Sequence, residues 1–124
     1  MALHRRSILV ALLCATISGP GHARADNLGE QVFKRNCALC HSTEPAKNKI
    51  GPTLAGILGR KAGTVPNFVY SESNRTSGIT WNAESLDQYL IDPRKFLPGT
   101  KMVFTGLRSA DDRRALIEYL ATQK

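Results

Sequence analysis

Two cysteines and a histidine fall within five consecutive positions of the chain, at Cys37, Cys40 and His41. This C-x-x-C-H spacing is the attachment pattern of c-type haem. Two thiols on one helical turn can add to the two vinyl groups of the porphyrin, and the histidine beside the second thiol then becomes an axial ligand of the iron. The residue types and their spacing therefore predict one haem c, attached covalently through Cys37 and Cys40 and ligated by His41.

The second axial ligand has one strong candidate. Met, His and Cys are the soft or imidazole ligands of haem iron, and beyond the first 25 residues Met102 is the only one outside the C-x-x-C-H motif. A single methionine more often fills a core. Met102, however, follows Pro98 and Gly99 in a loop, where the backbone can lie against a flat cofactor. We therefore predict His41 and Met102 as the two iron ligands.

The first 25 residues have the three regions of a secretory signal peptide. Basic residues precede an apolar run at 8–17, and a small-x-small cleavage site ends at Ala25. The alternative is an N-terminal membrane anchor, but the apolar run is about half of the ~20 residues that a membrane span needs. We predict cleavage after Ala25, export of the protein and one domain at 26–124.

Cleavage at this position leaves 99 residues with 14 basic and 10 acidic side chains, a formal charge of +4. The whole chain is 42% hydrophobic and 22% charged, which is ordinary globular composition and argues against extended disorder. A domain of this size has a modest core. It therefore gains from additional stabilisation.

The cysteine pair has three other interpretations. A structural zinc site needs about four Cys or His ligands, whereas the predicted domain has three, all in one short segment. A thioredoxin-like pair would lie in a βαβ pattern, and no strand-rich segment precedes Cys37. A Cys37–Cys40 disulfide would close a small loop with little entropic effect and would leave His41 unexplained. Haem attachment accounts for all three side chains.

Short helices and a long loop must position these residues. Local signals predict four helices and one helical turn, at 28–40, 83–91, 93–97, 109–122 and 71–75. The segment 42–69 has no sustained hydrophobic period, and a loop of this length normally has a function or lies on a cofactor. Since no strand pattern of any length is present, we predict an all-α, loop-rich domain.

Gly29 lies inside the first predicted helix, where glycine costs ~1 kcal/mol relative to alanine. A close helix crossing would explain it, because a residue without a side chain lets the C-terminal helix approach. Phe33 would then meet Leu116 and Tyr119. We therefore predict that the N- and C-terminal helices cross at Gly29.

Several motifs in order make the chain resemble class I cytochrome c, the mitochondrial protein and its close bacterial relatives. The resemblance covers 26–124 and rests on Gly29, Phe33 and the motifs at 37–41, 51–60, 67–70, 78–81, 98–102 and 116–119. It implies a single domain in which the terminal helices cross, while loops and short helices wrap around one covalent haem.

The resemblance also implies roles for further side chains. The Pro52 carbonyl would accept a hydrogen bond from His41, which would orient the imidazole. Leu54 would pack on the haem face, and the Tyr89 hydroxyl would lie near the Met102 sulfur. Hydrogen bonds to the haem propionates or to an inner water network are implied for Arg60, Tyr70, Asn74, Trp81 and Thr100.

These features predict a soluble periplasmic one-electron carrier and no enzyme, because side chains fill both axial positions of the iron. The expected partners are acidic-faced redox proteins: a cytochrome reductase complex or dehydrogenase as donor, and an oxidase, reductase or reaction centre as acceptor. The carrier is expected to be a monomer that reaches the membrane only through these partners. The alternative is a peroxidase-like haem enzyme or gas sensor in which Met102 can be displaced.

By the same resemblance, Phe104 and a ring of basic side chains surround the exposed haem edge; the basic members are Lys47, Lys49, Arg94, Lys95, Lys101 and Arg108. Such a ring would steer acidic partners, and its effect would weaken with salt. Scattered cations on a solvated surface are the alternative. We expect no nucleic-acid partner, because the chain has no recognition motif for one.

Overall fold

The computed structural model describes residues 21–124. This part of the chain contains the helices α1 (Gly21–Asn36), α2 (Glu72–Thr76), α3 (Ala83–Ile91), α4 (Pro93–Phe96) and α5 (Ala110–Thr122). Its only β-structure is an isolated bridge between Lys61 and Thr80. The predicted all-α, loop-rich domain is therefore confirmed. Residues 1–20 of the predicted signal peptide lie outside the described residues.

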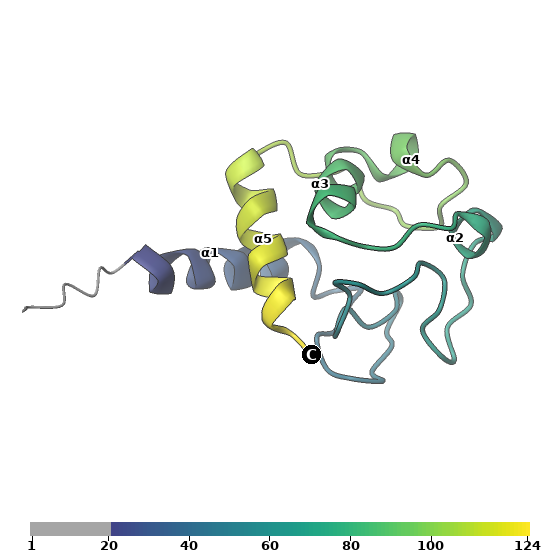
Figure 1. The fold of residues 1–124 in the computed structure, drawn as a ribbon, viewed down its shortest axis with the longest axis horizontal. Coiled ribbons are helices and arrows are strands. Elements are labelled where there is room, and N and C mark those ends of the chain that lie inside the picture. The colour runs from purple at the N-terminus through teal and green to yellow at the C-terminus, as the bar shows by residue number, and fades with distance from the viewer. Residues whose placement is uncertain (1–20) are drawn as a thin grey trace, which may run out of the picture.

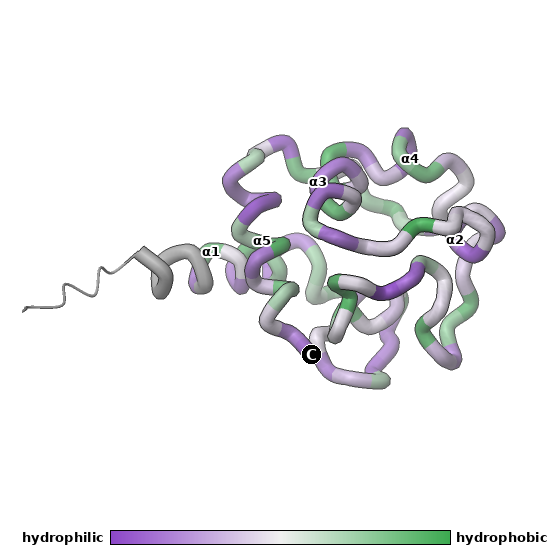
Figure 2. Tube along the Cα trace, in the orientation of Figure 1, coloured by the Kyte–Doolittle hydropathy of each residue, from purple (hydrophilic) through white to green (hydrophobic). Residues whose placement is uncertain are grey.

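The helices lie around an interior that long loops complete (Figure 1). Helices α1 and α5 cross at one end of the molecule, and α2 lies at the other end. Helices α3 and α4 form one side, and the loops between 41 and 70 form the opposite side. None of the described helices has the length and apolar content to cross a membrane, and the coloured trace in Figure 2 has no long unbroken hydrophobic stretch.

Side-chain caps set the starts of the later helices, as the sequence predicts. Asn82 and Ser85 form a reciprocal capping box at α3, with Asn82 Oδ1 accepting from the Ser85 N–H at 2.8 Å. Asp92 caps α4, which has proline at its first position, and the Ser109 hydroxyl accepts from Asp112 at the start of α5. Each cap satisfies a backbone N–H that the first helical turn leaves without a partner.

The first helix differs from its prediction at both ends. Helix α1 already begins at Gly21, and it ends at Asn36 rather than at residue 40. Beyond Asn36 the carbonyls bond to the following loop: Cys40 O accepts from the Gly51 N–H at 2.7 Å, and Ala38 O accepts from the Lys49 ammonium. These tertiary bonds replace a further helical turn, so the C-x-x-C-H motif lies in an irregular turn.

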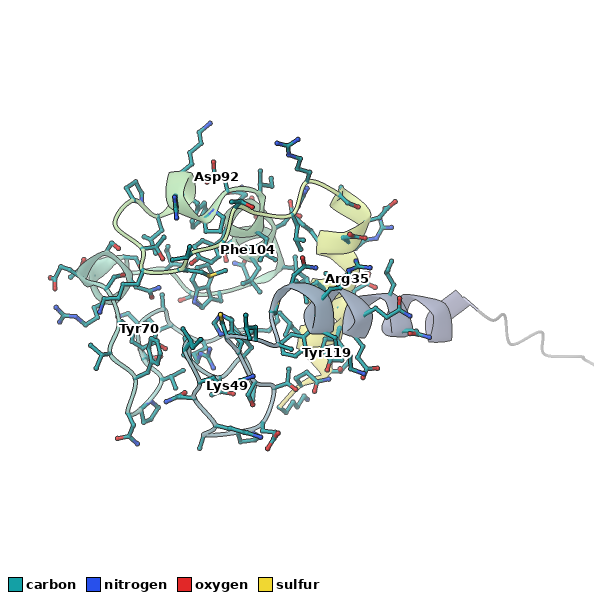
Figure 3. All side chains as sticks on the ribbon, turned by 180° about the vertical axis from the view of Figure 1, so that it is seen from behind. Arg35, Lys49, Tyr70, Asp92, Phe104 and Tyr119 are labelled. Atoms are coloured by element: carbon teal, nitrogen blue, oxygen red, sulfur yellow. The ribbon has the colours of Figure 1, made fainter. Side chains whose placement is uncertain are left out.

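The crossing of α1 and α5 at Gly29 is confirmed. A Cβ atom at Gly29 would lie 2.2 Å from Ala115 O and 2.6 Å from Tyr119 Cβ, so only glycine fits this crossing as it stands. The rings of Phe33 and Tyr119 pack with their centroids 5.7 Å apart, and Leu116 is buried in the same core. Tyr119 lies at this crossing in Figure 3. The contact fixes α1, whose end leads into the cysteine pair.

Candidate cofactor site

A mostly apolar cavity lies in the interior and brings together segments that are far apart in the sequence. The cavity has a volume of about 250 Å³, which is close to the lower end of the roughly 300–1,000 Å³ of small-molecule pockets. In Figure 3, Phe104 lies on one side of the interior, and Lys49 and Tyr70 lie on the other. All twelve predicted site residues line this cavity: Cys37, Cys40, His41, Pro52, Leu54, Arg60, Tyr70, Asn74, Trp81, Tyr89, Thr100 and Met102.

The two cysteines present free thiols at the edge of this cavity. Neither is in a disulfide, and both are partly buried. Burial, with a smaller contribution from Cys40, raises the pKa of the Cys37 thiol to about 11, so this thiol is protonated at neutral pH. Two unpaired thiols on one turn are the donor set that attachment to two vinyl groups needs.

The imidazole of His41 is held in one orientation. Its Nδ1 lies 2.7 Å from the Pro52 carbonyl oxygen, and this carbonyl can only accept, so Nδ1 carries the proton and Nε2 keeps a free lone pair. Burial lowers the pKa of His41 despite this hydrogen bond. The neutral imidazole is the form that ligates a metal.

Gly51 is a site residue to which the sequence interpretation assigned no role. A Cβ atom at this position would lie 2.3 Å from His41 Cε1, so a side chain there would displace the imidazole. The available signal was its place directly before Pro52, in the segment that returns to the C-x-x-C-H turn. Only the folded contact shows which side chain this glycine accommodates.

The thioether of Met102 is supported from helix α3. The Tyr89 hydroxyl donates to Met102 Sδ at 3.2 Å and lies 3.4 Å from the Thr100 hydroxyl, the arrangement that the resemblance implies. Burial raises the pKa of Tyr89, so its hydroxyl keeps its proton and remains a donor. The ring of Trp81 packs against that of Tyr89 with centroids 5.0 Å apart. These contacts orient the sulfur.

Three polar side chains that line the cavity differ in how many of their hydrogen-bonding groups have a partner. Arg60 donates to the carbonyls of Thr53 and Ala55, each at 2.9 Å, which leaves further guanidinium N–H groups free. The Tyr70 hydroxyl accepts from the Val65 N–H at 3.2 Å and still has a proton to donate. Asn74 Oδ1 is buried without a hydrogen-bond partner. A buried polar atom of this kind points to a missing partner in the cavity, so the lining fits a large apolar cofactor with polar edge groups.

The predicted basic ring divides into paired and unpaired cations. Lys47 forms an ion pair with Glu44 at 2.7 Å, and Lys49 donates to Ala38 O. Within the described part of the chain, five members form no ion pair; these are Lys49, Arg94, Lys95, Lys101 and Arg108, and all but Lys49 lie on α4 or in the segment 97–109. The unpaired positive charge of the ring is therefore concentrated on α4 and the loop that contains Met102.

Comparisons with known proteins agree with this geometry. The sequence model of the family "Cytochrome c" matches residues 27–124. The chain is 51% identical over 92 residues to cytochrome c type-1 of Ascaris suum, which covers 74% of this chain and 82% of that protein. It is 43% identical over 117 residues to cytochrome c2 of Blastochloris viridis, 94% of this chain and 91% of that protein.

A solved structure extends the agreement to the fold. Cytochrome cH from Methylobacterium extorquens superposes with a TM-score of 0.74 at 42% identity, over 78% of this chain and 97% of that chain. The predicted class of fold, with crossing terminal helices and loops around one site, is thereby confirmed.

Proposed function

The chain belongs to the cytochrome c family, and on that premise we propose that it is a monomeric periplasmic one-electron carrier with His41 and Met102 as its iron ligands. Members of the family are haem electron carriers that bind haem c through two cysteines, which here are Cys37 and Cys40. When bound, haem c supplies one-electron exchange between Fe(II) and Fe(III).

The observation that carries the proposal is the combination of donors around one apolar cavity. The neutral His41 imidazole has Nε2 free, and Tyr89 orients the Met102 sulfur, so each ligand is held by a second side chain or carbonyl. A soft thioether favours the reduced state of iron, and the apolar lining disfavours the extra positive charge of the oxidised state. With His41 and Met102 both holding the iron, the bound haem would exchange electrons while substrates could not reach the metal.

The extent of similarity supports export. The match to cytochrome c2 of Blastochloris viridis covers 117 residues, more than the 99 residues between Asp26 and Lys124. It therefore reaches into the predicted signal peptide, whereas the match to the Ascaris suum protein covers 92 residues. Similarity that extends into this segment supports our proposal that it is an export leader and that the protein is periplasmic.

The first test is the intact mass of the protein isolated from its own host. We expect the mass of residues 26–124 plus one haem, because cleavage follows Ala25 and the thiols of Cys37 and Cys40 form bonds to the haem. The haem should remain attached after acid-acetone extraction. Extraction of free haem by this treatment would contradict covalent attachment, and a mass that includes residues 1–25 would contradict cleavage.

The docking surface of the carrier is proposed from its unpaired charge. Members of the family act as redox partners of reductase complexes and oxidases. We propose that the partners of this chain present acidic faces to Arg94, Lys95, Lys101 and Arg108, none of which is neutralised by an ion pair in the described structure. Long-range attraction of this kind accelerates encounter and falls with ionic strength.

Charge reversal at Lys101 tests this surface. Lys101→Glu should slow electron transfer to the physiological acceptor by about tenfold at low salt and flatten the salt dependence. The reduction potential should hardly change, because exposed charges are screened over about 10 Å at 0.1 M salt. The quantities to measure are the bimolecular rate against ionic strength and the sulfur–iron absorption band, which reports that Met102 is still bound.

Lys124→Glu is the matched control, since Lys124 is an exposed lysine at the C-terminus and outside the basic ring. It should change the rate much less than Lys101→Glu does. Equal effects at the two positions would mean that only overall charge matters. If neither reversal has an effect, the docking surface is apolar and the basic ring is an ordinary solvated surface.

A further inference from the structure

Helix α5 contains a buried arginine that the proposed function does not use. Arg113 is 8% exposed. Its Nε donates to Asp87 Oδ1 at 2.7 Å, and its Nη1 donates to the carbonyls of Leu107 and Arg108 at 2.9 and 3.0 Å. The next residue, Arg114, is exposed and pairs only with Asp111. A buried cation is costly unless its contacts are well made, so the position of Arg113 is a specific feature of the fold.

The two carbonyls that Arg113 binds end the loop that contains Met102. Thr100 N–H donates to Leu97 O at 3.1 Å, and the next backbone-to-backbone bond of the described chain is Leu107 N–H to Leu90 O at 2.7 Å. Residues 101–106 between these bonds make none. The return of the loop is therefore fixed at Leu107, whose N–H and carbonyl are both bound.

The same contacts meet on helix α3. Asp87, which binds Arg113, and Leu90, which binds Leu107, lie one turn apart on α3. Between them is Tyr89, which donates to the Met102 sulfur at 3.2 Å. The guanidinium thus joins α5, α3 and the end of the loop, and Tyr89 holds the sulfur from the same helix α3.

We infer that Arg113 is a positioning residue for Met102, which holds the return of the loop through Leu107 and Arg108 and so keeps the thioether on the iron. The inference rests on the proposed ligation by Met102. Its consequence is that weakening the Arg113 contacts releases the loop and admits external ligands while the helices remain packed. Local opening of this kind is separate from global unfolding.

Arg113→Lys in the holoprotein tests the inference. A lysine ammonium has no planar fork and cannot keep all three contacts of the guanidinium. We expect carbon monoxide to bind the reduced protein about tenfold faster than it binds wild type, the size expected for loss of one hydrogen bond from a charged donor to a buried acceptor. The sulfur–iron absorption band of the oxidised protein should lose intensity. Asp87→Asn, which leaves both carbonyl contacts in place, should give a smaller increase in the same direction.

Two controls separate positioning from general destabilisation. Val32→Ala removes volume from a fully buried site on α1 that does not line the cavity. Denaturation of each variant shows whether it loses as much stability as Arg113→Lys does. Arg114→Lys changes the exposed neighbouring arginine. Both should bind carbon monoxide within about twofold of wild type.

Two results would overturn the inference. The first is that Val32→Ala and Arg113→Lys lose equal stability and bind carbon monoxide at equal rates. The second is that the rate of carbon monoxide binding is unchanged in both Arg113→Lys and Asp87→Asn. If Arg113→Lys does not fold, Asp87→Asn decides alone. Failure of the proposed ligation is recognised separately, because Met102→Ala would then leave carbon monoxide binding unchanged.

Discussion

Met102→Ala is expected to open the iron to external ligands while the haem stays covalently attached. The reduced variant should bind carbon monoxide, the sulfur–iron absorption band should disappear, and the reduction potential should fall by on the order of 0.1 V or more, since axial ligands set haem potentials over about 0.8 V. The physical reason is that alanine supplies no donor, and no other Met, His or Cys outside the C-x-x-C-H motif follows Asp26.

Tyr89→Phe is the matched comparison for this experiment. It removes the hydroxyl that donates to the Met102 sulfur at 3.2 Å but keeps the thioether and the aromatic ring. It should therefore shift the potential less and leave the iron closed. If Met102→Ala behaves like wild type in all three measurements, Met102 is not the ligand. Rapid binding of carbon monoxide by the wild-type protein would instead favour a haem enzyme or gas sensor.

Local interactions explain which helices could be predicted from the sequence. Asn82, Asp92 and Ser109 each accept a hydrogen bond from a backbone N–H three residues later, so the start of each helix is encoded within one turn of sequence. Gly29 was also informative, because a glycine inside a helix needs a reason and close packing is the simplest one. The structure shows that the close neighbour is α5.

Contacts between distant segments explain what the sequence did not predict. The end of α1 depends on Lys49 and Gly51, which bind the carbonyls of the C-x-x-C-H turn from another loop. In the sequence, Arg113 cannot be distinguished from a basic residue on an exposed helix face. In the folded protein it is buried against α3 and the end of the Met102 loop. Arg60 uses two of its N–H groups on the backbone of its own loop. The resemblance had assigned this side chain only to the cofactor edge.

The candidate site was predicted better than the contacts that support it. Its proposed ligands are rare residue types, so counting Cys, His and Met from Asp26 onward leaves few candidates. The supporting contacts use backbone carbonyls and a glycine, as at Pro52 and Gly51. Every residue has a carbonyl, so no residue type marks the ones that matter. Motif order across the chain identified Pro52, and only the folded contact identified the role of Gly51.

Gly29→Ala is expected to destabilise the whole protein by about 2–3 kcal/mol. The added Cβ would lie 2.2 Å from Ala115 O and 2.9 Å from Ala115 C, so α1 and α5 must move apart. Overpacking of this kind costs about 1–3 kcal/mol and sometimes more. Alanine is a better helix former than glycine and offsets ~1 kcal/mol of this cost. We still place the net loss of stability near the upper end of the range, because the atoms that the Cβ would meet belong to the backbone. The melting temperature should fall by roughly 10–20 °C.

Gln31→Ala is the matched control, because Gln31 is an exposed residue on the same helix. Surface changes of this kind usually alter stability by no more than about 0.5 kcal/mol.

The sulfur–iron band distinguishes the loss of stability in Gly29→Ala from release of the Met102 loop. In Gly29→Ala the band should persist until the protein unfolds, since Gly29 contacts Ala115 and Tyr119 and the hydrogen bonds from Arg113 to Leu107 and Arg108 are unchanged in type. In Arg113→Lys it should weaken in the folded protein. A Gly29→Ala variant as stable as wild type, or more stable, would show that the two helices cross with room for a methyl group and that Gly29 is present for another reason.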